Sequence, residues 1–314
     1  SCCCRVEKVV QNGTLDPRKV KIPGIYVDGI VVARPENHWQ TYANPYDPAL
    51  SGEVKVPVNS IAPMKLNERK VICRRAAMEL DPAAIINLGI GMPEGIANVA
   101  NEEGLPGLKL TVEAGGIGGV PNAGTAFGTC TNPDAIIDQP YQFDFYDGGG
   151  LEVAFLSFAE LDAKGNVNVH KFNGKIMGTG GFVNICSGSK KVVLCGTLRA
   201  GGLKTEVGNG QIKVVQEGRF EKMIPECEEI TFSGEQALKQ GQKVVYITER
   251  AVFELTEEGV VLTEIAPGID VEKDIIAQMG FKPIISKELK PMDERIFQDE
   301  KMNIREEFMN QSFK

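Results

Sequence analysis

The fold is decided by a stretch in the first half of the chain, Leu108-Lys109-Leu110-Thr111-Val112-Glu113-Ala114-Gly115-Gly116-Ile117-Gly118-Gly119. The apolar run over residues 108–112 predicts a buried β-strand, and it ends at a carboxylate that four glycines follow within six residues. Glycine permits positive φ angles and close approach of another backbone. Glu113 is therefore expected beyond the carboxyl end of a strand, where ligands gather in open α/β sheets.

The segments before this stretch complete a strand–helix–strand unit. An apolar run over residues 84–88 predicts another short strand, and the turn Gly89-Ile90-Gly91-Met92-Pro93 follows it. Proline suits the first turn of a helix, so a helix is expected from this turn to about Glu103. Asn67 is suited to cap an earlier helix over residues 66–80. A strand, a crossover helix and a strand in this order predict parallel strands in a right-handed unit.

Apolar and β-branched runs continue this pattern towards the carboxyl end. They predict strands near residues 153–158, 167–170, 182–185 and 192–195, and antiparallel β-structure over 211–216 and 243–264. Helices are expected near residues 133–138 and over 270–279. The sequence therefore predicts an α/β fold, with an open, mostly parallel sheet and flanking helices plus antiparallel β segments.

The two ends of the chain differ from this central region. Residues 1–35 are expected to form a strand, a turn and a strand, and residues 35–65 are predicted to be an irregular arm at an interface. The last stretch, residues 291–314, is predicted to be a charged surface tail. We therefore divide the sequence into residues 1–65, a main domain over 66–290 and this tail.

Composition excludes several classes of function. The chain of 314 residues has a net charge of −8 and no basic run, which argues against nucleic acid and membrane surfaces as partners. No apolar stretch approaches the roughly 18 residues of a membrane span. Eight cysteines, with no C-x-x-C pair, favour free thiols in a reducing cytoplasm. With two histidines and no spaced ligand set, no metal site is expected.

The residues alone leave several interpretations open. Glu113 follows the segment Gly89–Gly95 by 18 residues, near the roughly 20 of a dinucleotide fingerprint, so a nicotinamide-dependent Rossmann dehydrogenase is one alternative. A proline at position 93 and glycines after the acid do not fit ribose recognition. Another glycine-rich stretch, Asn173–Phe182, precedes Lys190-Lys191 and is either an anion site or a hairpin with solvated lysines. Glu113 itself could be a glutamate on a loop beside a tight turn.

Taken together, the motifs resemble the class I coenzyme A (CoA) transferases, and most closely the acetate/propionate CoA-transferase group. The resembling segments are Gly13–Pro17, Lys21–Asp28, Gly89–Pro93, Thr111–Gly119, Gln142–Gly150, His170–Phe182, Ile247–Arg250 and Glu264–Gly268. They cover nearly the whole chain, and the combination is far more specific than any one motif. The resemblance implies the fold of that family.

The resemblance also implies roles for individual residues. Glu113 matches the nucleophile that forms a glutamyl-CoA thioester. Contacts to CoA are expected from Gly89, Ile90, Gly91, Met92, Pro93, Asn173, Gly174, Gly178 and Lys191, with Lys190 as an alternative to the last. Backbone groups at Gly178, Gly115 and Gly116 are expected to face the oxyanion. Proline at position 93 has no N–H, so Met92, Glu94 or a group from elsewhere is expected to supply the other donor.

The resemblance further implies substrates and partners. CoA is both a substrate and part of a covalent intermediate, no permanently bound cofactor is expected, and acetate, propionate or a similar short-chain acid is the acceptor. Residues 1–65 match the end of the family's N-terminal half, so the remainder of that half is expected in the same full-length chain or in a separate subunit. We also expect a homo-oligomer. A non-catalytic CoA-binding subunit and a thioesterase are further alternatives.

Overall fold

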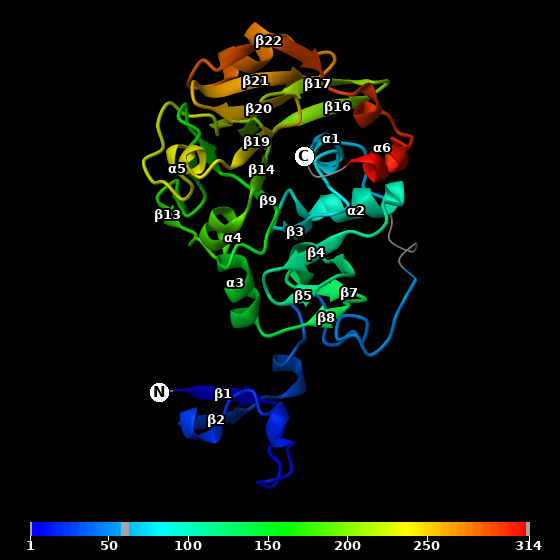
Figure 1. Cartoon of the computed structure of the whole chain (residues 1–314), viewed down its shortest axis with the longest axis vertical. Coiled ribbons are helices and arrows are strands. Elements are labelled where there is room, and N and C mark those ends of the chain that lie inside the picture. The colour runs from blue at the N-terminus through cyan, green and yellow to red at the C-terminus, as the bar shows by residue number, and fades with distance from the viewer. Residues whose placement is uncertain (1, 58–62, 312–314) are drawn as a thin grey trace. The chain divides into compact units, whose positions relative to one another are not determined.

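The computed structural model describes residues 2–57 and 63–311, and it divides into two units, Ser1–Pro48 and Ala49–Lys314 (Figure 1). The boundary thus falls at residue 48, whereas the sequence suggested residue 65. No helix in the described part of the chain is long and apolar enough to cross a membrane.

The first unit is a small β-structure without a core of its own. Strand β1 (Cys3–Val6) pairs in parallel with β2 (Gly29–Val32), so the two strands expected in this region are present. Short 3-10 turns at Pro17–Lys19, Gly24–Tyr26 and Pro35–Asn37 make up the other regular structure described there. None of residues 2–48 is buried. Since parallel sheets normally have both faces covered, this unit needs a covering structure.

The second unit is built on one large sheet. Its ten strands have the order β22-β21-β20-β19-β14-β9-β3-β4-β5-β8. The central strands are mutually parallel: β19 (Lys243–Ile247), β14 (Lys191–Cys195), β9 (Val153–Ser157), β3 (Ile85–Leu88) and β4 (Lys109–Val112). The predicted parallel pairing of the two strands before Glu113 is therefore confirmed, as is the mixed α/β fold with a mostly parallel sheet.

Antiparallel strands extend this sheet at both ends. At one end β20 (Ala251–Thr256) and β21 (Gly259–Ile265) continue the sheet in antiparallel fashion, and β22 (Ile284–Pro291) pairs in parallel with β21. At the other end β5 (Gly116–Ile117) turns back along β4 and pairs with β8 (Ala135–Ile136). The antiparallel segment predicted over 243–264 is confirmed.

Smaller two-stranded sheets complete the strand inventory of the described residues. They are β6 (Val120–Pro121) with β7 (Cys130–Thr131), β10 (Glu160–Leu161) with β11 (Val167–Asn168), β12 (Lys171–Phe172) with β13 (Lys175–Ile176), β15 (Arg199–Ala200) with β18 (Phe220–Glu221), and β16 (Lys204–Gly208) with β17 (Gln211–Gln216). Most of them lie in the connections that follow the central strands.

Helices cover the two faces of the large sheet, and each face has its own apolar core. On one face lie α1 (Glu68–Ala77), α2 (Glu94–Glu103) and α6 (Arg305–Asn310). On the other lie α3 (Gln139–Asp147), α4 (Phe182–Gly188) and α5 (Gly234–Lys239) (Figure 1). Alternate residues of β14 enter the two cores, as the period of a strand requires. The predicted cap is confirmed, because the Asn67 side chain accepts the Lys70 N–H.

Three predicted elements are wrong. The helix expected near residues 133–138 is strand β8, and the helix there begins only at Gln139. The strand expected over 182–185 belongs to helix α4. Phe182, Ile185 and Cys186 are buried while Val183 is 42% exposed, which is the i, i+3, i+4 spacing of one helix face. Over 270–279 the chain forms a π turn, Val271–Ile275, and a 3-10 turn, Ile276–Gln278, in place of a regular helix.

The prediction of a surface tail is also wrong for the described part of residues 291–314. Met292, Ile296, Phe297, Met302, Ile304 and Phe308 are buried in the core beneath α1 and α2. The Glu103 carboxylate accepts the backbone N–H groups of Met302 and Asn303 at 2.8 and 2.7 Å. Charge alone therefore does not predict the position of this segment, because its apolar residues are buried between charged ones.

Candidate active site

Glu113 stands where the sequence placed it, directly after β4 at the carboxyl edge of the sheet. The chain turns sharply there, because the Gly115 N–H donates to the Val112 carbonyl at 2.9 Å. Gly115 has a φ of 114°, which disfavours any other residue. The turn sends β5 back along β4 and leaves the Glu113 side chain half-buried at the edge.

The Glu113 carboxylate lies against the glycine-rich segment that precedes α4. A side chain at Gly181 would overlap Glu113 Oε2 and the ring of Phe143, so only glycine fits that position. The Gly181 N–H donates to the carboxylate. Burial raises the pKa of Glu113, and the Gly181 hydrogen bond opposes that rise. The fold therefore brings together two of the three predicted glycine segments at one carboxylate.

A buried polar network holds the end of β4 in place. The Tyr146 hydroxyl on α3 donates to Thr111 Oγ1 at 2.9 Å and accepts the amides of Asn87 and Gln142 at 3.0 and 2.7 Å. All four side chains are at most 3% exposed. Burial, and more weakly the charge of Glu113, raises the pKa of Tyr146. Sequence reasoning missed this network, and its only signal is two polar residues within strands that are otherwise apolar.

Ser157, at the end of β9, organises the predicted Gly89–Pro93 turn. Its hydroxyl donates to the Ile90 carbonyl at 2.8 Å and accepts the Met92 N–H at 3.2 Å. The Gly89 N–H donates to the Phe155 carbonyl at 2.8 Å. The turn is thus fixed to the strand beside β3, at the same edge of the sheet as Glu113.

These bonds narrow the choice of an oxyanion donor in the turn. The Met92 N–H is already taken by Ser157, and Pro93 has none. Within residues 2–57 and 63–311, no acceptor bonds the N–H of Gly91 or of Glu94. These two groups are therefore the available donors nearest to the proline.

The segment around Gly178 is a hairpin followed by open glycine backbone. Strands β12 and β13 pair across Asn173 and Gly174, whose φ values of 51° and 71° are those of a tight two-residue turn. The hairpin interpretation of this segment is therefore confirmed. The Gly178 N–H donates to the His170 carbonyl at 3.2 Å. In this conformation the predicted oxyanion donor at Gly178 is engaged by the protein.

The glycines after Glu113 allow neighbouring segments to pack closely against this turn. A Cβ on Gly115 would overlap the Ile137 carbonyl, and one on Gly116 would meet Cys130 Sγ at 2.8 Å. Both residues are buried, and the Gly115 N–H closes the turn on Val112. The contacts do not support the prediction that Gly115 donates to an oxyanion, and Gly116 lies inside the β4–β5–β8 ladder.

The next predicted CoA contact is Lys191. It begins β14, so it lies at the amino edge of the parallel sheet, opposite to Glu113. The strand rise of about 3.3 Å per residue puts it roughly 13 Å from the carboxyl end of its own strand. Its Nζ pairs with Glu79 Oε2 at 2.5 Å. Lys190, the alternative, pairs with Glu152 at 3.6 Å near the same edge. The structure therefore places the Lys191 ammonium in an ion pair away from Glu113.

A pocket of about 580 Å³ opens at the carboxyl edge, beyond β9 and β14. Aromatic and charged side chains line it, together with two alanines and one asparagine: Phe158, Ala159, Glu160, Phe172, Asn173, Arg199, Ala200, Arg219, Phe220, Glu221 and Lys222. Of the residues predicted to contact CoA, Asn173 lines this pocket. We call it the Lys222 pocket.

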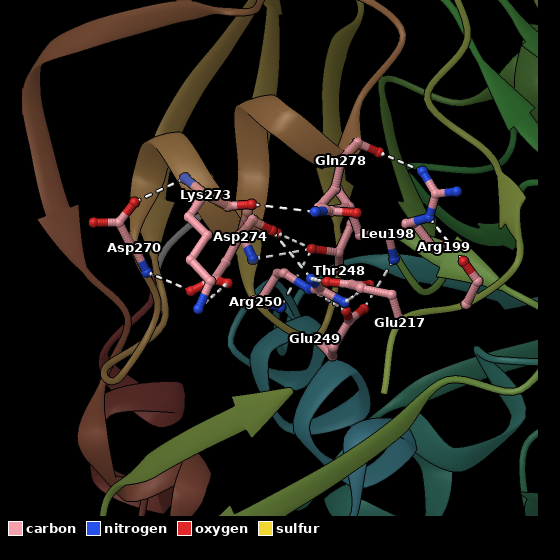
Figure 2. A network of polar contacts seen from close by, with 12 residues as sticks. Leu198, Arg199, Glu217, Thr248, Glu249, Arg250, Asp270, Lys273, Asp274 and Gln278 are labelled. Atoms are coloured by element: carbon pink, nitrogen blue, oxygen red, sulfur yellow. Dashed lines mark hydrogen bonds and ion pairs between the residues drawn. The ribbon is translucent and has the colours of Figure 1, made fainter. Parts of the chain in front are cut away.

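A buried ionic network supports one wall of the Lys222 pocket (Figure 2). Arg250 bonds Glu249 at 2.6 Å and Glu217 at 2.7 and 3.1 Å. The other oxygen of Glu249 accepts the Leu198 N–H at 2.9 Å, directly before Arg199. Glu249 and Arg250 are fully buried. Glu249 and Arg250 thus form a structural ion pair, which fixes the loop after β14.

Comparisons with known proteins agree with this geometry. No family model matches the chain. It is 52% identical over 95% of its length to the acetate CoA-transferase YdiF of Escherichia coli O157:H7, covering 56% of that protein. It is 43% identical over 94% of its length to the caffeate CoA-transferase of Acetobacterium woodii, covering 57%. The chain thus spans little more than half of these relatives.

Solved structures agree as well. The apoenzyme of the E. coli O157:H7 acyl-CoA transferase YdiF matches with a TM-score of 0.86 and 51% identity, covering 96% of this chain and 56% of that one. A thioester complex of the same enzyme with CoA matches with a TM-score of 0.80 and 50% identity, with the same coverage. This degree of similarity leaves the nicotinamide-dehydrogenase alternative without support. The chain belongs to the family of class I coenzyme A transferases.

Proposed function

We propose that this chain carries the catalytic carboxylate of an enzyme that transfers CoA from a short-chain acyl-CoA to acetate, propionate or a similar acid. The observation that carries the proposal is the position of Glu113. Its carboxylate is half-buried at the carboxyl edge of the sheet, against the backbone of Gly181. The CoA thioester complex of the E. coli relative supports a covalent intermediate of this kind.

The chemistry follows a ping-pong sequence in which Glu113 is the nucleophile. Its carboxylate oxygen attacks the acyl-CoA carbonyl, the carbon–sulfur bond breaks, and a mixed anhydride and CoA thiolate form. The thiolate attacks the glutamyl carbonyl, the anhydride carbon–oxygen bond breaks, and the first carboxylate leaves. A second carboxylate then reverses both steps. No net proton is consumed, and dividing one difficult exchange into easier steps is covalent catalysis.

The surroundings of Glu113 suit this role. Partial burial makes the carboxylate a better nucleophile, while the Gly181 N–H favours its ionised form. Gly91 and Glu94 in the first turn offer N–H groups to the oxyanion of the attacked carbonyl. Each well-placed donor of this kind contributes about 3–4 kcal/mol to the transition state. We expect Gly178 to become a donor only if ligand binding releases its bond to His170.

We propose the first turn and the hairpin as contacts for the CoA arm. Gly89, Ile90, Gly91, Met92 and Pro93 lie beside β9, and Asn173, Gly174 and Gly178 lie on the segment that leads to Gly181. Both segments flank Glu113 at the same edge. CoA is thus a substrate and part of the intermediate, and the proposed chemistry needs no permanently bound cofactor.

We propose that the rest of the transferase completes the acid pocket. The relatives are almost twice as long as the matched region, and a 27% identical relative is the beta subunit of the acetate CoA-transferase of Haemophilus influenzae. The remaining half therefore belongs either to the same full-length chain or to a separate subunit. Residues 1–65 then form the end of the N-terminal half and the linking arm. We expect its apolar surface to be covered by that half, within a homo-oligomer.

The test is CoA exchange between acetyl-CoA and labelled propionate by the full-length protein. Parallel double-reciprocal plots are expected from the ping-pong sequence. A Glu113→Ala protein should lose exchange, whereas Glu258→Ala, at an exposed loop glutamate, should retain it. Intact exchange by the Glu113→Ala protein would reject the proposal. Release of free acid and CoA without a second carboxylate would indicate a thioesterase, and CoA binding without either reaction a non-catalytic subunit.

A further inference from the structure

The Lys222 pocket contains a buried amine without a counter-ion. Lys222 is 9% exposed, and among residues 2–57 and 63–311 no carboxylate lies within ion-pair distance of its Nζ. Its polar contact is with an aromatic ring, because Nζ lies 4.0 Å from the centroid of Phe158. An unpaired buried charge is costly for a folded protein. A ligand that supplies negative charge would remove that cost.

The acids around the pocket are already committed to other partners. Glu249 bonds Arg250 and the Leu198 N–H, as described above. Glu221 pairs with Arg199 at 3.3 Å. Glu160 accepts the Asn168 side-chain amide at 2.7 Å. Glu249 acts on Lys222 only at longer range, and none of these acids lies within ion-pair distance of the Lys222 Nζ in the described part of the chain.

The other lining groups suit a planar base with phosphates. Phe220 is 51% exposed, and the Arg219 guanidinium lies 5.6 Å from its ring centroid. Exposed aromatic rings beside cations stack nucleic-acid bases while the cations hold phosphates. The volume of about 580 Å³ lies within the roughly 300–1,000 Å³ usual for small-ligand sites.

The distance between the pocket and Glu113 also agrees with one CoA molecule that reaches both. It opens beyond β9 and β14, and β9 is two strands away from β4 in the sheet. At a strand spacing of about 4.8 Å, β9 lies roughly 10 Å from the strand that carries Glu113. The flexible arm of CoA separates its thiol from its nucleotide, so one molecule can span both positions.

We propose that the Lys222 pocket binds the phosphorylated adenosine end of CoA, with the Lys222 ammonium holding a phosphate and Phe220 stacking on the base. This inference rests on the proposed function, because it concerns the same substrate. It adds a specificity site that is remote from the reacting atoms. Binding energy gained there from the nucleotide can offset strain at the thioester.

The pKa of the amine agrees with a site that needs a ligand. Burial lowers the pKa of Lys222 to about 8, and Glu249 and Cys195 only partly oppose this. The Cys195 thiol stays neutral, because burial raises its pKa well above the usual value. The other charged groups that line the pocket are Glu160, Glu221, Arg199 and Arg219. A bound phosphate should raise the pKa, and affinity should fall as pH rises through about 8.

The experiment compares thioesters with and without the nucleotide. The KM of the full-length protein for acetyl-CoA should rise about ten- to a hundredfold in Lys222→Met, the range of one charged hydrogen bond. The KM for acetyl-pantetheine should not change, and Lys222→Arg should restore most of the affinity for acetyl-CoA. Lys239→Met removes an exposed lysine on α5 and serves as the matched control. An equal loss with both thioesters, or no loss with either, would overturn the proposal.

A binding measurement separates this proposal from the catalytic one. Calorimetric titration with adenosine 3′,5′-bisphosphate requires no turnover. Binding that Lys222→Met abolishes supports the nucleotide site even if Glu113 never reacts. A protein that forms the Glu113 thioester but binds the bisphosphate equally well in both forms would contradict the pocket alone. The same Lys222 dependence for inorganic phosphate or acetate, without binding of the bisphosphate, would also contradict it.

Discussion

The two edges of the central sheet differ in whether all of their charged side chains have ion-pair partners. At the amino edge, Lys191 pairs with Glu79 at 2.5 Å, and Arg75 on α1 pairs with Glu79 at 2.6 Å. Burial alone would raise the pKa of Glu79, but Arg75 and Lys191 lower it to about 2. At this edge every one of these charges has a partner, so the arrangement serves stability.

At the carboxyl edge Glu249 and Arg250 pair with each other, but Glu113 and Lys222 have no ion-pair partner among the described residues. Glu113 faces glycine backbone, and its strongest opposing interaction is one N–H from Gly181. Lys222 lies on an aromatic ring with no carboxylate in reach among the described residues. Two unpaired charged groups at this edge, where the other charges are paired, mark it as the place for a ligand. The predictions below test this contrast.

The largest effect is expected from removing the nucleophile. Glu113→Gln keeps the size of the side chain and removes its charge, so the rate of CoA exchange should fall by about 10⁴-fold or more. The folded structure should remain, because Glu113 makes no ion pair that an amide would break. Steady-state exchange and thermal denaturation of the same protein would check both statements. A fall of less than tenfold in the exchange rate would contradict the assignment of the carboxyl edge as the catalytic one.

A smaller loss is expected from filling the space beside the nucleophile. Gly181 has a φ of −80°, so alanine is allowed there by the backbone, yet its Cβ would overlap Glu113 Oε2. Misplacement of a reacting group by about 1 Å can reduce the rate about 100-fold. We expect Gly181→Ala to lower kcat by about that factor, and the overlap with the Phe143 ring to lower the melting temperature as well. In Gly208→Ala the new Cβ meets nothing within 4 Å, and this control should be fully active.

The acid limb of the rate profile provides a third test. Burial raises the pKa of Glu113 above its usual 4.5, and only the ionised carboxylate can attack. As pH falls, kcat/KM should therefore begin to drop at a higher pH than for an ordinary glutamate, and then fall about tenfold per pH unit. The profile should be measured above the pH at which the fold is lost. A limb at or below pH 4.5 would mean that the carboxylate is solvated.

The smallest effect is expected at the amino edge. Lys191→Met breaks a partly exposed pair with Glu79 that Arg75 still neutralises, so we expect a loss of about 1 kcal/mol in unfolding free energy. The KM for acetyl-CoA should not change. Denaturant unfolding and initial rates measure the two quantities. A tenfold rise in KM would place CoA at the amino edge and reverse the comparison.

The sequence predicted the parts of the site that depend on local pattern. The strand before Glu113, its glycine turn and the cap at Asn67 follow from residue order and spacing. The position of Lys191 was also within reach, because the predicted strand over 192–195 already put that lysine at an amino end. The direction of that strand decides where the lysine lies, and the resemblance alone does not give it.

Other features depend on contacts between distant segments. Lys222 is one lysine in a charged stretch, and only the packing of Phe158 and the commitment of Glu249 to Arg250 give it an unpaired charge. The Tyr146 network likewise joins α3 to β3 and β4 through side chains far apart in the sequence. Neither hydrophobic periodicity nor motif spacing in the sequence predicts contacts between such distant segments.

The most direct test of the central claim is the mass of the peptide that contains Glu113 after brief incubation of the full-length protein with acetyl-CoA. The account predicts that this peptide gains the mass of CoA through a thioester, and that borohydride reduces Glu113 to the alcohol. Both changes should be absent from the Glu113→Gln protein. Attachment of CoA to another residue, or full exchange activity with an unmodified Glu113 peptide under the same conditions, would contradict it.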